Sequence, residues 1–277
     1  CSAKRMYPDY ISAKKMRENY EGNVFSPMGC RSFLSPWMDE NGNYKFEGRF
    51  NQGVVSLNLP QIGILARGDM DKFWRIFNER IEIIKDALVY RVERVKEATP
   101  ENAPIMYQHG AFGKRLKPED SVDEVFKNKR ATVSMGYIGL YEVATTFFGS
   151  EWEGNPEAKE FTLEIVRRMK EYADEWGEEY GYHFSLYSTP SESLTDRFAR
   201  MDKEAFGSIE DITDKDYYTN SFHYDVRKNP TPFEKLDFEK DYPEYCSGGF
   251  IHYCEYPNMR QNPKALEAVW DYAYDRV

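Results

Sequence analysis

The chain has 277 residues, 41% of them hydrophobic and 16% aromatic, which is enough to build a substantial core in one large domain or two small ones. Its formal charge of −10 argues against DNA or RNA as a binding partner, because nucleic-acid binding depends on Lys and Arg side chains that neutralise phosphates. No apolar run approaches the roughly 18 residues needed to span a bilayer, and the chain shows no signal-peptide pattern, so we expect a cytoplasmic protein with no membrane partner.

In the first third of the chain, local patterns predict two helices, a hairpin turn and a strand. We expect a short helix from Pro8 to Tyr20 and a turn at residues 39–43, where Asn-Gly is a strong hairpin signal. Val54 to Leu59 is rich in branched residues and predicts a strand, which Pro60 would end. From Asp69, a plausible N-cap, to about Ala98, apolar residues recur at three- and four-residue steps, which predicts an amphipathic helix outside a sheet.

The rest of the chain alternates short apolar runs with helical patterns. We expect strands at 104–107, 131–135, 183–187 and 250–253, and helices at 118–127, 140–148, 156–180, 190–201 and 263–274. Alternation of this kind is typical of an α/β fold. Periodicity alone leaves open whether the sheet is open or closed, and without repeats or linker-like stretches we expect a single domain.

One cysteine lies in an unusual setting. The cysteine is Cys30, in the stretch from Ser26 to Leu34. In this stretch the ring of Pro27 fixes the φ angle of its own residue, and Gly29 accepts backbone angles that other residues refuse. The stretch therefore predicts a tight loop with Cys30 at or near its tip. For a lone cysteine, a buried small hydrophobic residue would be the commoner interpretation. An ionic nucleophile would need an activating histidine or a helix N-terminus, and none of the four histidines lies in a recognisable activating motif. A cysteine hydrolase is therefore disfavoured.

The motifs around and beyond this cysteine carry a resemblance to a known family. They are Ser26–Leu34, Asn51–Pro60, Gly136–Gly139, Phe184–Glu192, Tyr217–His223 and Gly248–Ile251. Together they resemble the large subunit of the anaerobic (class III) ribonucleotide reductases, which are glycyl-radical enzymes, and the resemblance covers the whole chain. It implies an α/β closed barrel of two half-barrels with a central finger loop. Residues 1–277 would be a partial catalytic barrel truncated at both ends.

The resemblance also implies radical chemistry and a set of residues around the sugar. Cys30 would form a thiyl radical that removes the 3′ hydrogen of a ribonucleoside triphosphate, which is then reduced to the 2′-deoxyribonucleotide. Asn51 would hydrogen-bond the ribose, for which its amide is chemically suited. Met28 and Ser32 would line the same pocket, although simple loop packing is an equal alternative for both. Tyr187 matches a tyrosine near the sugar.

The segment after Tyr187 predicts both a helix cap and a phosphate site. Thr189 to Glu192 has the pattern of a capping box with Pro190 at the first helical position. A helix N-terminus also favours an anion, and Ser188, Thr189 and Ser191 would add hydroxyl donors. The resemblance implies that this segment faces the substrate phosphates.

Other parts of the family pattern are missing from the sequence. The resemblance implies a nucleotide-sensing region before residue 1, and beyond residue 277 a structural zinc and a glycyl radical that an S-adenosylmethionine/iron–sulfur activase installs. We expect no metal or cofactor in this chain, no activity of the chain alone, formate or a thiol as reductant, and a homodimer of the full enzyme. His252 and Cys254 are expected on one face of a strand, with Cys246 nearby, rather than in a zinc site. Two alternatives stay open, a non-catalytic assembly partner and another glycyl-radical enzyme.

Overall fold

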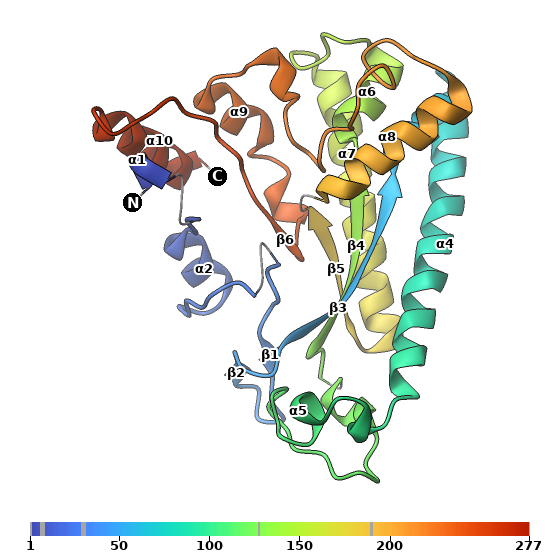
Figure 1. Ribbon diagram of the computed structural model, residues 1–277, viewed down its shortest axis with the longest axis vertical. Helices are drawn as coiled ribbons and strands as arrows, with labels where there is room; N and C mark the ends of the chain where they lie inside the picture. The colour runs from blue at the N-terminus through green and yellow to red at the C-terminus, as the bar shows by residue number, and fades with distance from the viewer. Residues whose placement is uncertain (1, 6–8, 29–31, 127, 189–190, 277) are drawn as a thin grey trace.

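The computed structural model describes residues 2–5, 9–28, 32–126, 128–188 and 191–276. At its centre lies a parallel sheet in the order β3-β4-β5-β6, made of Phe50–Asn58, Ala131–Ile138, His183–Ser188 and Gly249–Phe250. In Figure 1 the strands stand upright, with their carboxyl ends towards the top of the molecule. The predicted α/β fold is confirmed.

Strand β4 is the best-covered strand of the sheet. All its residues are buried, as expected for a parallel strand covered on both faces. Within it, Gly136 allows the neighbouring strands to approach, because a Cβ at this position would lie 2.7 Å from the Ser56 Oγ atom on β3. A side chain at this point would therefore require the Ser56 side chain, or β3 itself, to shift.

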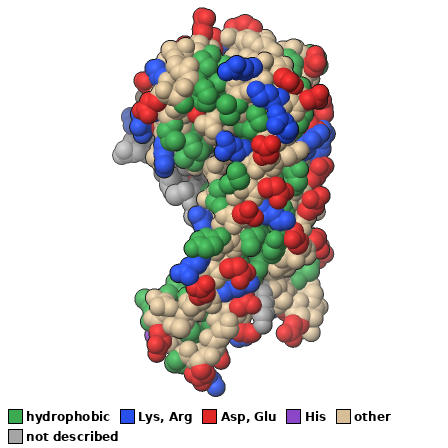
Figure 2. All heavy atoms as spheres, turned by 90° about the vertical axis from the view of Figure 1, so that its right-hand side faces the viewer, with side chains coloured by type: hydrophobic (Ala, Val, Ile, Leu, Met, Phe, Trp, Pro, Cys, Tyr) green, Lys and Arg blue, Asp and Glu red, His purple; other side chains and the backbone are tan. Residues whose placement is uncertain are grey.

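Two long helices cover the sheet, and both were predicted from periodicity. α4 comprises Met70–Lys96, and the Asp69 side chain accepts a hydrogen bond from the backbone of its first turn, which confirms the predicted N-cap. α7 comprises Pro156–Tyr180, as predicted. Both helices pack their apolar stripes against β3 to β5, and most of their buried hydrophobic residues belong to the main core. Figure 2 shows the side of the molecule that includes α4, where acidic and basic side chains are intermixed.

Three helices begin at the carboxyl edge of the sheet, each soon after a strand. α3 (Leu59–Ala66) follows β3, α6 (Leu140–Phe148) follows β4 and α8 (Glu192–Phe206) follows β5. Between β4 and α6, Gly139 adopts a φ of 77°, and a Cβ there would collide with the Pro60 ring at the start of α3. The chain thus turns from strand to helix in one residue, which only glycine accommodates without strain.

Smaller elements surround this core. They are α1 (Ser2–Arg5), α2 (Ala13–Asn19), the hairpin of β1 (Trp37–Met38) and β2 (Tyr44–Lys45), α5 (Pro104–Tyr107), α9 (Pro232–Glu239), α10 (Pro263–Arg276) and 3₁₀ turns at 100–102, 122–125, 226–228 and 243–245. The hairpin confirms the predicted turn at residues 39–43. In Figure 1 the two ends of the chain lie side by side, and the Tyr10 and Trp270 rings are 4.5 Å apart.

Several predicted boundaries were wrong. Residues 104–107 form a helical turn rather than a strand, because Pro104 occupies the first helical position. Pro60 does not simply end a strand but lies in the first turn of α3, which was not predicted. In the described residues from 118 to 126, helical structure is limited to the 3₁₀ turn, and α2 begins only at Ala13 after the Ser12 N-cap.

Two further differences bear on the site. α8 begins at Glu192, later than the predicted start, and β6 ends at Phe250, so His252 and Cys254 do not lie on a strand. The described strands β3 to β6 form an open sheet with β3 and β6 as its edges, so closure into a barrel stays a prediction. Within the described ranges, no helix combines the length and apolar character needed to cross a membrane.

Candidate functional site

The described residues on either side of Cys30 lie near the carboxyl end of β5 and the start of β6. Met28 and Ser32 form an antiparallel bridge, in which the Met28 N–H donates to the Ser32 carbonyl at 2.9 Å. Just beyond the bridge, the Phe33 N–H donates to the Gly248 carbonyl at 3.0 Å. Cys30 itself, with residues 29 and 31, lies outside the described residues, so its predicted place at a loop tip stays a prediction.

A side-chain contact joins this stretch to the sheet. The Ser32 Oγ atom lies 3.0 Å from the Tyr187 hydroxyl, within hydrogen-bonding distance, although 155 positions separate the two residues. Tyr187 lies near the end of β5, in register with Gly136 on β4 and Gly249 on β6. The structure therefore brings together two of the residues predicted to face the substrate, at the edge where parallel α/β sheets bind their ligands.

Ser188 is engaged inside the fold. It is fully buried, and its hydroxyl donates to the Tyr137 hydroxyl at 2.7 Å and lies 2.9 Å from the Cys246 sulfur. Burial raises the pKa of the Cys246 thiol to about 12, so this cysteine stays protonated at neutral pH. The role of Ser188 as a phosphate ligand stays a prediction. In that role its hydroxyl would have to give up its contacts with Tyr137 and Cys246.

At the start of α8 the structure corrects the predicted cap. Ser191 occupies the N-cap position, but its side chain makes no capping hydrogen bond, and its N–H donates to the Asn220 Oδ1 atom at 3.0 Å. Thr189 and Pro190 lie outside the described residues. The predicted capping box with proline at the first helical position is wrong, because the helix begins two residues later.

Asn51 lies apart from Tyr187. It is exposed at the beginning of β3, and its Oδ1 atom accepts a hydrogen bond from the Gly53 N–H at 2.8 Å. Its partner on β4 is Thr132, four residues before the partner of Tyr187, which corresponds to about 13 Å along the strand. Its predicted contact with the ribose stays a prediction.

Buried carboxylates around the carboxyl edge were not predicted. Glu142, in the first turn of α6, accepts hydrogen bonds from the Thr219 N–H at 2.9 Å and the Thr219 hydroxyl at 2.7 Å, and it pairs with the buried Lys215 ammonium. Asp202, on α8, accepts from the Tyr218 hydroxyl at 2.9 Å. A glutamate within the otherwise apolar start of α6 was the available sequence signal.

A third buried carboxylate holds two histidines. The Glu239 oxygens lie 3.3 Å from the His223 Nδ1 atom and 2.7 Å from the His252 Nδ1 atom, and Lys235 pairs with the same carboxylate. Although burial opposes ionisation, these partners together lower the pKa of Glu239 well below its usual range. His252 is thus part of a polar cluster around a buried carboxylate. Among the described residues, no group of three or more His, Cys, Asp and Glu side chains could hold a metal ion.

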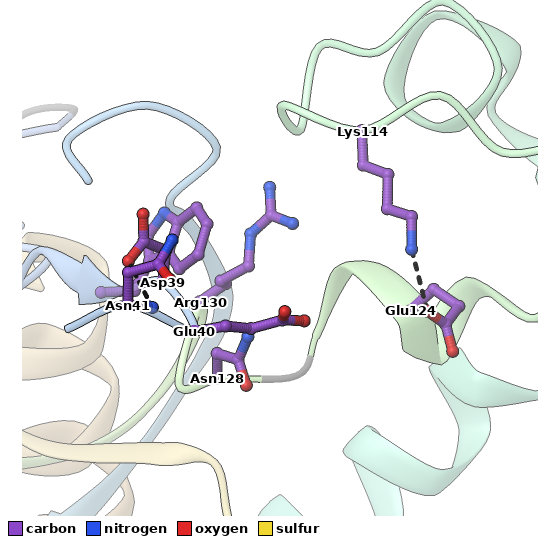
Figure 3. A pocket seen from close by; sticks show the side chains of 8 residues that line it. Asp39, Glu40, Asn41, Lys114, Glu124, Asn128 and Arg130 are labelled. Atoms are coloured by element: carbon purple, nitrogen blue, oxygen red, sulfur yellow. Dashed lines mark hydrogen bonds and ion pairs between the residues drawn. The ribbon is translucent and has the colours of Figure 1, made fainter. Parts of the chain in front are cut away.

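A hollow of about 450 Å³ lies away from these residues, near the amino end of the sheet (Figure 3). It is lined by Trp37, Asp39, Glu40, Asn41, Lys114, Glu124, Asn128 and Arg130. On one side of it Lys114 and Glu124 form an ion pair at 2.9 Å, and on the other side the Arg130 guanidinium lies over the Trp37 ring. None of the predicted site residues that the structure describes lines it.

The fold and the contacts at its carboxyl edge define an α/β protein whose candidate active site lies where the parallel strands end and three helices begin. Comparison with known proteins identifies its family. A family model described as anaerobic ribonucleoside-triphosphate reductase matches residues 1–277, and the chain belongs to that family.

Individual relatives agree with this assignment. The anaerobic ribonucleoside-triphosphate reductase of Escherichia coli K12 is 49% identical over 278 residues, covering all of this chain and 39% of the relative. The enzyme of the same name from Enterobacteria phage T4 is 47% identical, covering 99% of this chain and 44% of the relative. The chain thus spans about two fifths of the length of these relatives.

Solved structures support the fold. The anaerobic ribonucleotide reductase from Thermotoga maritima in complex with dATP and CTP matches 87% of this chain and 38% of that chain, with a TM-score of 0.65 and 22% identity. The same reductase with dATP bound in the specificity site matches with a TM-score of 0.64 and 21% identity.

Proposed function

We propose that this chain forms part of the catalytic barrel of an anaerobic ribonucleotide reductase, which converts ribonucleoside triphosphates into 2′-deoxyribonucleoside triphosphates. The observation that carries the proposal is the contact between Ser32 and Tyr187. It joins the stretch containing Cys30 to the carboxyl edge of β5 in a chain that belongs to this family throughout its length. Barrel closure would be completed by parts of the reductase outside residues 1–277.

The proposed chemistry begins with a thiyl radical on Cys30. The sulfur takes the 3′ hydrogen atom of the ribose, so an S–H bond forms, a C–H bond breaks and the unpaired electron moves to the 3′ carbon. The 2′ hydroxyl then leaves with a proton as water. The proton lost in the water is supplied by solvent. Formate, which becomes carbon dioxide, or a pair of thiols, which becomes a disulfide, supplies two electrons and a proton, so that a new C–H bond forms at the 2′ carbon and the unpaired electron returns to the 3′ carbon. The hydrogen atom then passes back from Cys30 to the 3′ carbon, which restores the thiyl radical.

On the basis of the family resemblance, we assign the remaining components of the reaction to other parts of the enzyme. The glycyl radical that generates the thiyl radical, its iron–sulfur activase and a structural zinc would all lie outside residues 1–277. Among the described residues of this chain, no group of three or more His, Cys, Asp and Glu side chains could hold such a zinc. We propose that the chain alone is inactive and that the full enzyme is a homodimer.

The substrate is proposed to lie between the Cys30 stretch and the start of α8. Tyr187 and Ser32 would face the sugar, with Met28, which is partly exposed beside the Ser32 bridge. Thr189 and Ser191 would receive the phosphates at the N-terminus of α8, where backbone N–H groups and the helix dipole favour an anion. Asn51 would hydrogen-bond the ribose, although it lies at the start of β3, away from the level of Tyr187, and its Oδ1 atom accepts from the Gly53 N–H.

The decisive experiment replaces the sulfur. In an anaerobic reductase that contains residues 1–277, Cys30→Ser should abolish deoxynucleotide formation while the glycyl radical signal in the electron paramagnetic resonance spectrum persists. Cys254→Ser, at a half-buried cysteine that the proposal does not use, is the matched control and should retain turnover. Turnover by the Cys30→Ser enzyme would overturn the radical assignment. If the enzyme complex forms normally and no substitution of Cys30 affects its turnover, this chain would instead act only as an assembly partner.

A further inference from the structure

The segment from Tyr218 to Ser221 connects the starts of two of the helices at the carboxyl edge. Its backbone carbonyls accept hydrogen bonds from the N–H groups of Gly139 and Leu140 at the start of α6, at 2.9 and 3.2 Å. At the other side, the Asn220 amide oxygen accepts from the Ser191 N–H at the start of α8. One short segment therefore fixes α6 through its backbone and α8 through a side chain.

α8 lacks the side-chain capping bond found at other helices, and Asn220 contacts instead the N–H of its N-cap residue, Ser191. At the starts of α3, α4, α7 and α9 the N-cap residue binds the backbone of the first turn with its own side chain, through Asn58, Asp69, Asn155 and Thr231. At α8 the Ser191 side chain makes no such bond. The beginning of this helix is instead held from outside by Asn220, which leaves the Ser191 hydroxyl available for another partner.

The two residues that precede Asn220 are each bound to a buried carboxylate. Thr219, the preceding residue, is bound through its N–H and its hydroxyl to the Glu142 carboxylate, which is buried in α6. Tyr218 donates its hydroxyl to Asp202, which is buried in α8. Buried charges keep such contacts because an unsatisfied carboxylate is costly, so the segment has little freedom to shift.

We propose that Asn220 is a positioning residue for the substrate phosphates. By holding the Ser191 N–H, it sets the start of α8 against the end of β5, and with it the N–H groups and hydroxyl that would receive the anion. The inference rests on the proposed phosphate site at the start of α8. Asn220 itself does not contact the substrate in this proposal. Its replacement should therefore affect substrate binding rather than the chemical step.

The test is steady-state kinetics in a reductase that contains residues 1–277. Asn220→Ala removes the acceptor and should raise the KM for the ribonucleoside triphosphate by about fivefold or more, the scale of one hydrogen bond, with kcat changed less than about twofold. Asn220→Gln retains the amide but moves its oxygen by one methylene, and should raise the KM in the same way. This second variant preserves the test if the alanine variant fails to fold.

Hydrogen exchange reports the positioning itself. Backbone exchange at residues 191–195 should become faster in Asn220→Ala and stay slow in Asn220→Asp, whose carboxylate can still accept from the Ser191 N–H. The matched control is Asn155→Ala, which removes the cap of α7 and should lower the melting temperature without changing the KM. An equal rise in KM in this control would overturn the proposal, because general helix destabilisation would then explain the effect.

Ser191→Asp separates this inference from the proposed function beneath it. A carboxylate at the phosphate site should weaken substrate binding by about tenfold through like-charge repulsion. If Ser191→Asp raises the KM but Asn220→Ala changes neither KM nor exchange, the phosphate site stands and the positioning role is overturned. If Ser191→Asp leaves the KM unchanged, the phosphate site itself fails and the inference fails with it.

Discussion

The Asn58 side chain, at the end of β3, donates a hydrogen bond of 2.8 Å to the Asp202 carboxylate on α8. Gln61 donates to the other oxygen of Asp202 at 2.7 Å, and Tyr218 adds a third bond. A single buried carboxylate therefore joins the first strand of the sheet, the helix that follows it, and the helix at the proposed phosphate site. This geometry explains why α8 lies across the carboxyl edge, as Figure 1 shows.

Replacing this carboxylate should destabilise the fold. Asp202→Ala would leave three donors without their acceptor in a buried setting, and we expect a loss of about 3 kcal/mol in the free energy of unfolding. Chemical denaturation of the purified chain measures it. Asp196→Ala, at an exposed position of the same helix, is the control and should change the free energy by less than about 0.5 kcal/mol. Equal effects of the two variants would contradict the role given to Asp202.

A second prediction concerns the pH dependence of stability. Burial, with help from the nearby Lys129 and Lys170, lowers the pKa of His183 to about 4. The unfolded chain, in which a histidine has a pKa of about 6.5, then binds more protons than the folded chain below that pH. The contribution of His183 is therefore fully present above pH 6.5 and is lost as the pH falls from 6.5 towards 4.

The expected size of this effect is about 1–2 kcal/mol of unfolding free energy between pH 7 and pH 5. His183→Gln retains a partner for the Thr132 hydroxyl, which lies 3.1 Å from the His183 Nδ1 atom, and should flatten the dependence. His109→Gln, at an exposed histidine, is the matched variant. Denaturation curves at the two pH values give the change in unfolding free energy between pH 7 and pH 5. The prediction is contradicted if both substitutions alter this change equally.

A third prediction follows from the buried thiol beside Ser188. With its pKa raised to about 12, Cys246 presents a thiolate fraction of only about one in ten thousand at pH 8. It should resist iodoacetamide while the chain is folded and react at an ordinary rate in urea. Mass spectrometry of labelled peptides measures both rates. Rapid labelling of Cys246 in the native chain would show that the thiol is accessible and the buried contact with Ser188 incorrect.

The sequence predicted those parts of the fold whose causes are local. The bounds of α7 follow from Asn155 as N-cap and Gly181 after its last turn, and the start of α4 follows from Asp69. The start of α8 could not be predicted in this way, because it is fixed by Asn220, 29 positions away. α3 was missed because Pro60 was interpreted as the end of a strand, whereas a proline also suits the first turn of a helix.

Local sequence patterns predicted less of the candidate site than of the fold. Residues such as Ser32 and Tyr187 were selected by resemblance, since nothing in the neighbouring sequence of either residue indicates that their hydroxyls meet. The buried carboxylates Glu142, Asp202 and Glu239 bind partners from distant segments. Their roles depend on tertiary contacts that short-range periodicity does not encode.

The last prediction tests whether the contact between Ser32 and Tyr187 contributes to turnover. Ser32→Ala and Tyr187→Phe each remove one hydroxyl of the pair and should each lower kcat of a reductase that contains residues 1–277. If the two hydroxyls act through their mutual bond, the double variant should be no slower than the slower single variant, with a coupling energy of about 1 kcal/mol. Ser56→Ala combined with Tyr187→Phe is the comparison, because Ser56 lies on β3, two strands away from β5. Independent hydroxyls would instead multiply their effects on kcat. Additivity in the Ser32 and Tyr187 cycle would mean that this bond does not hold the Cys30 stretch in its catalytic position, and the observation on which the proposed function rests would lose its support.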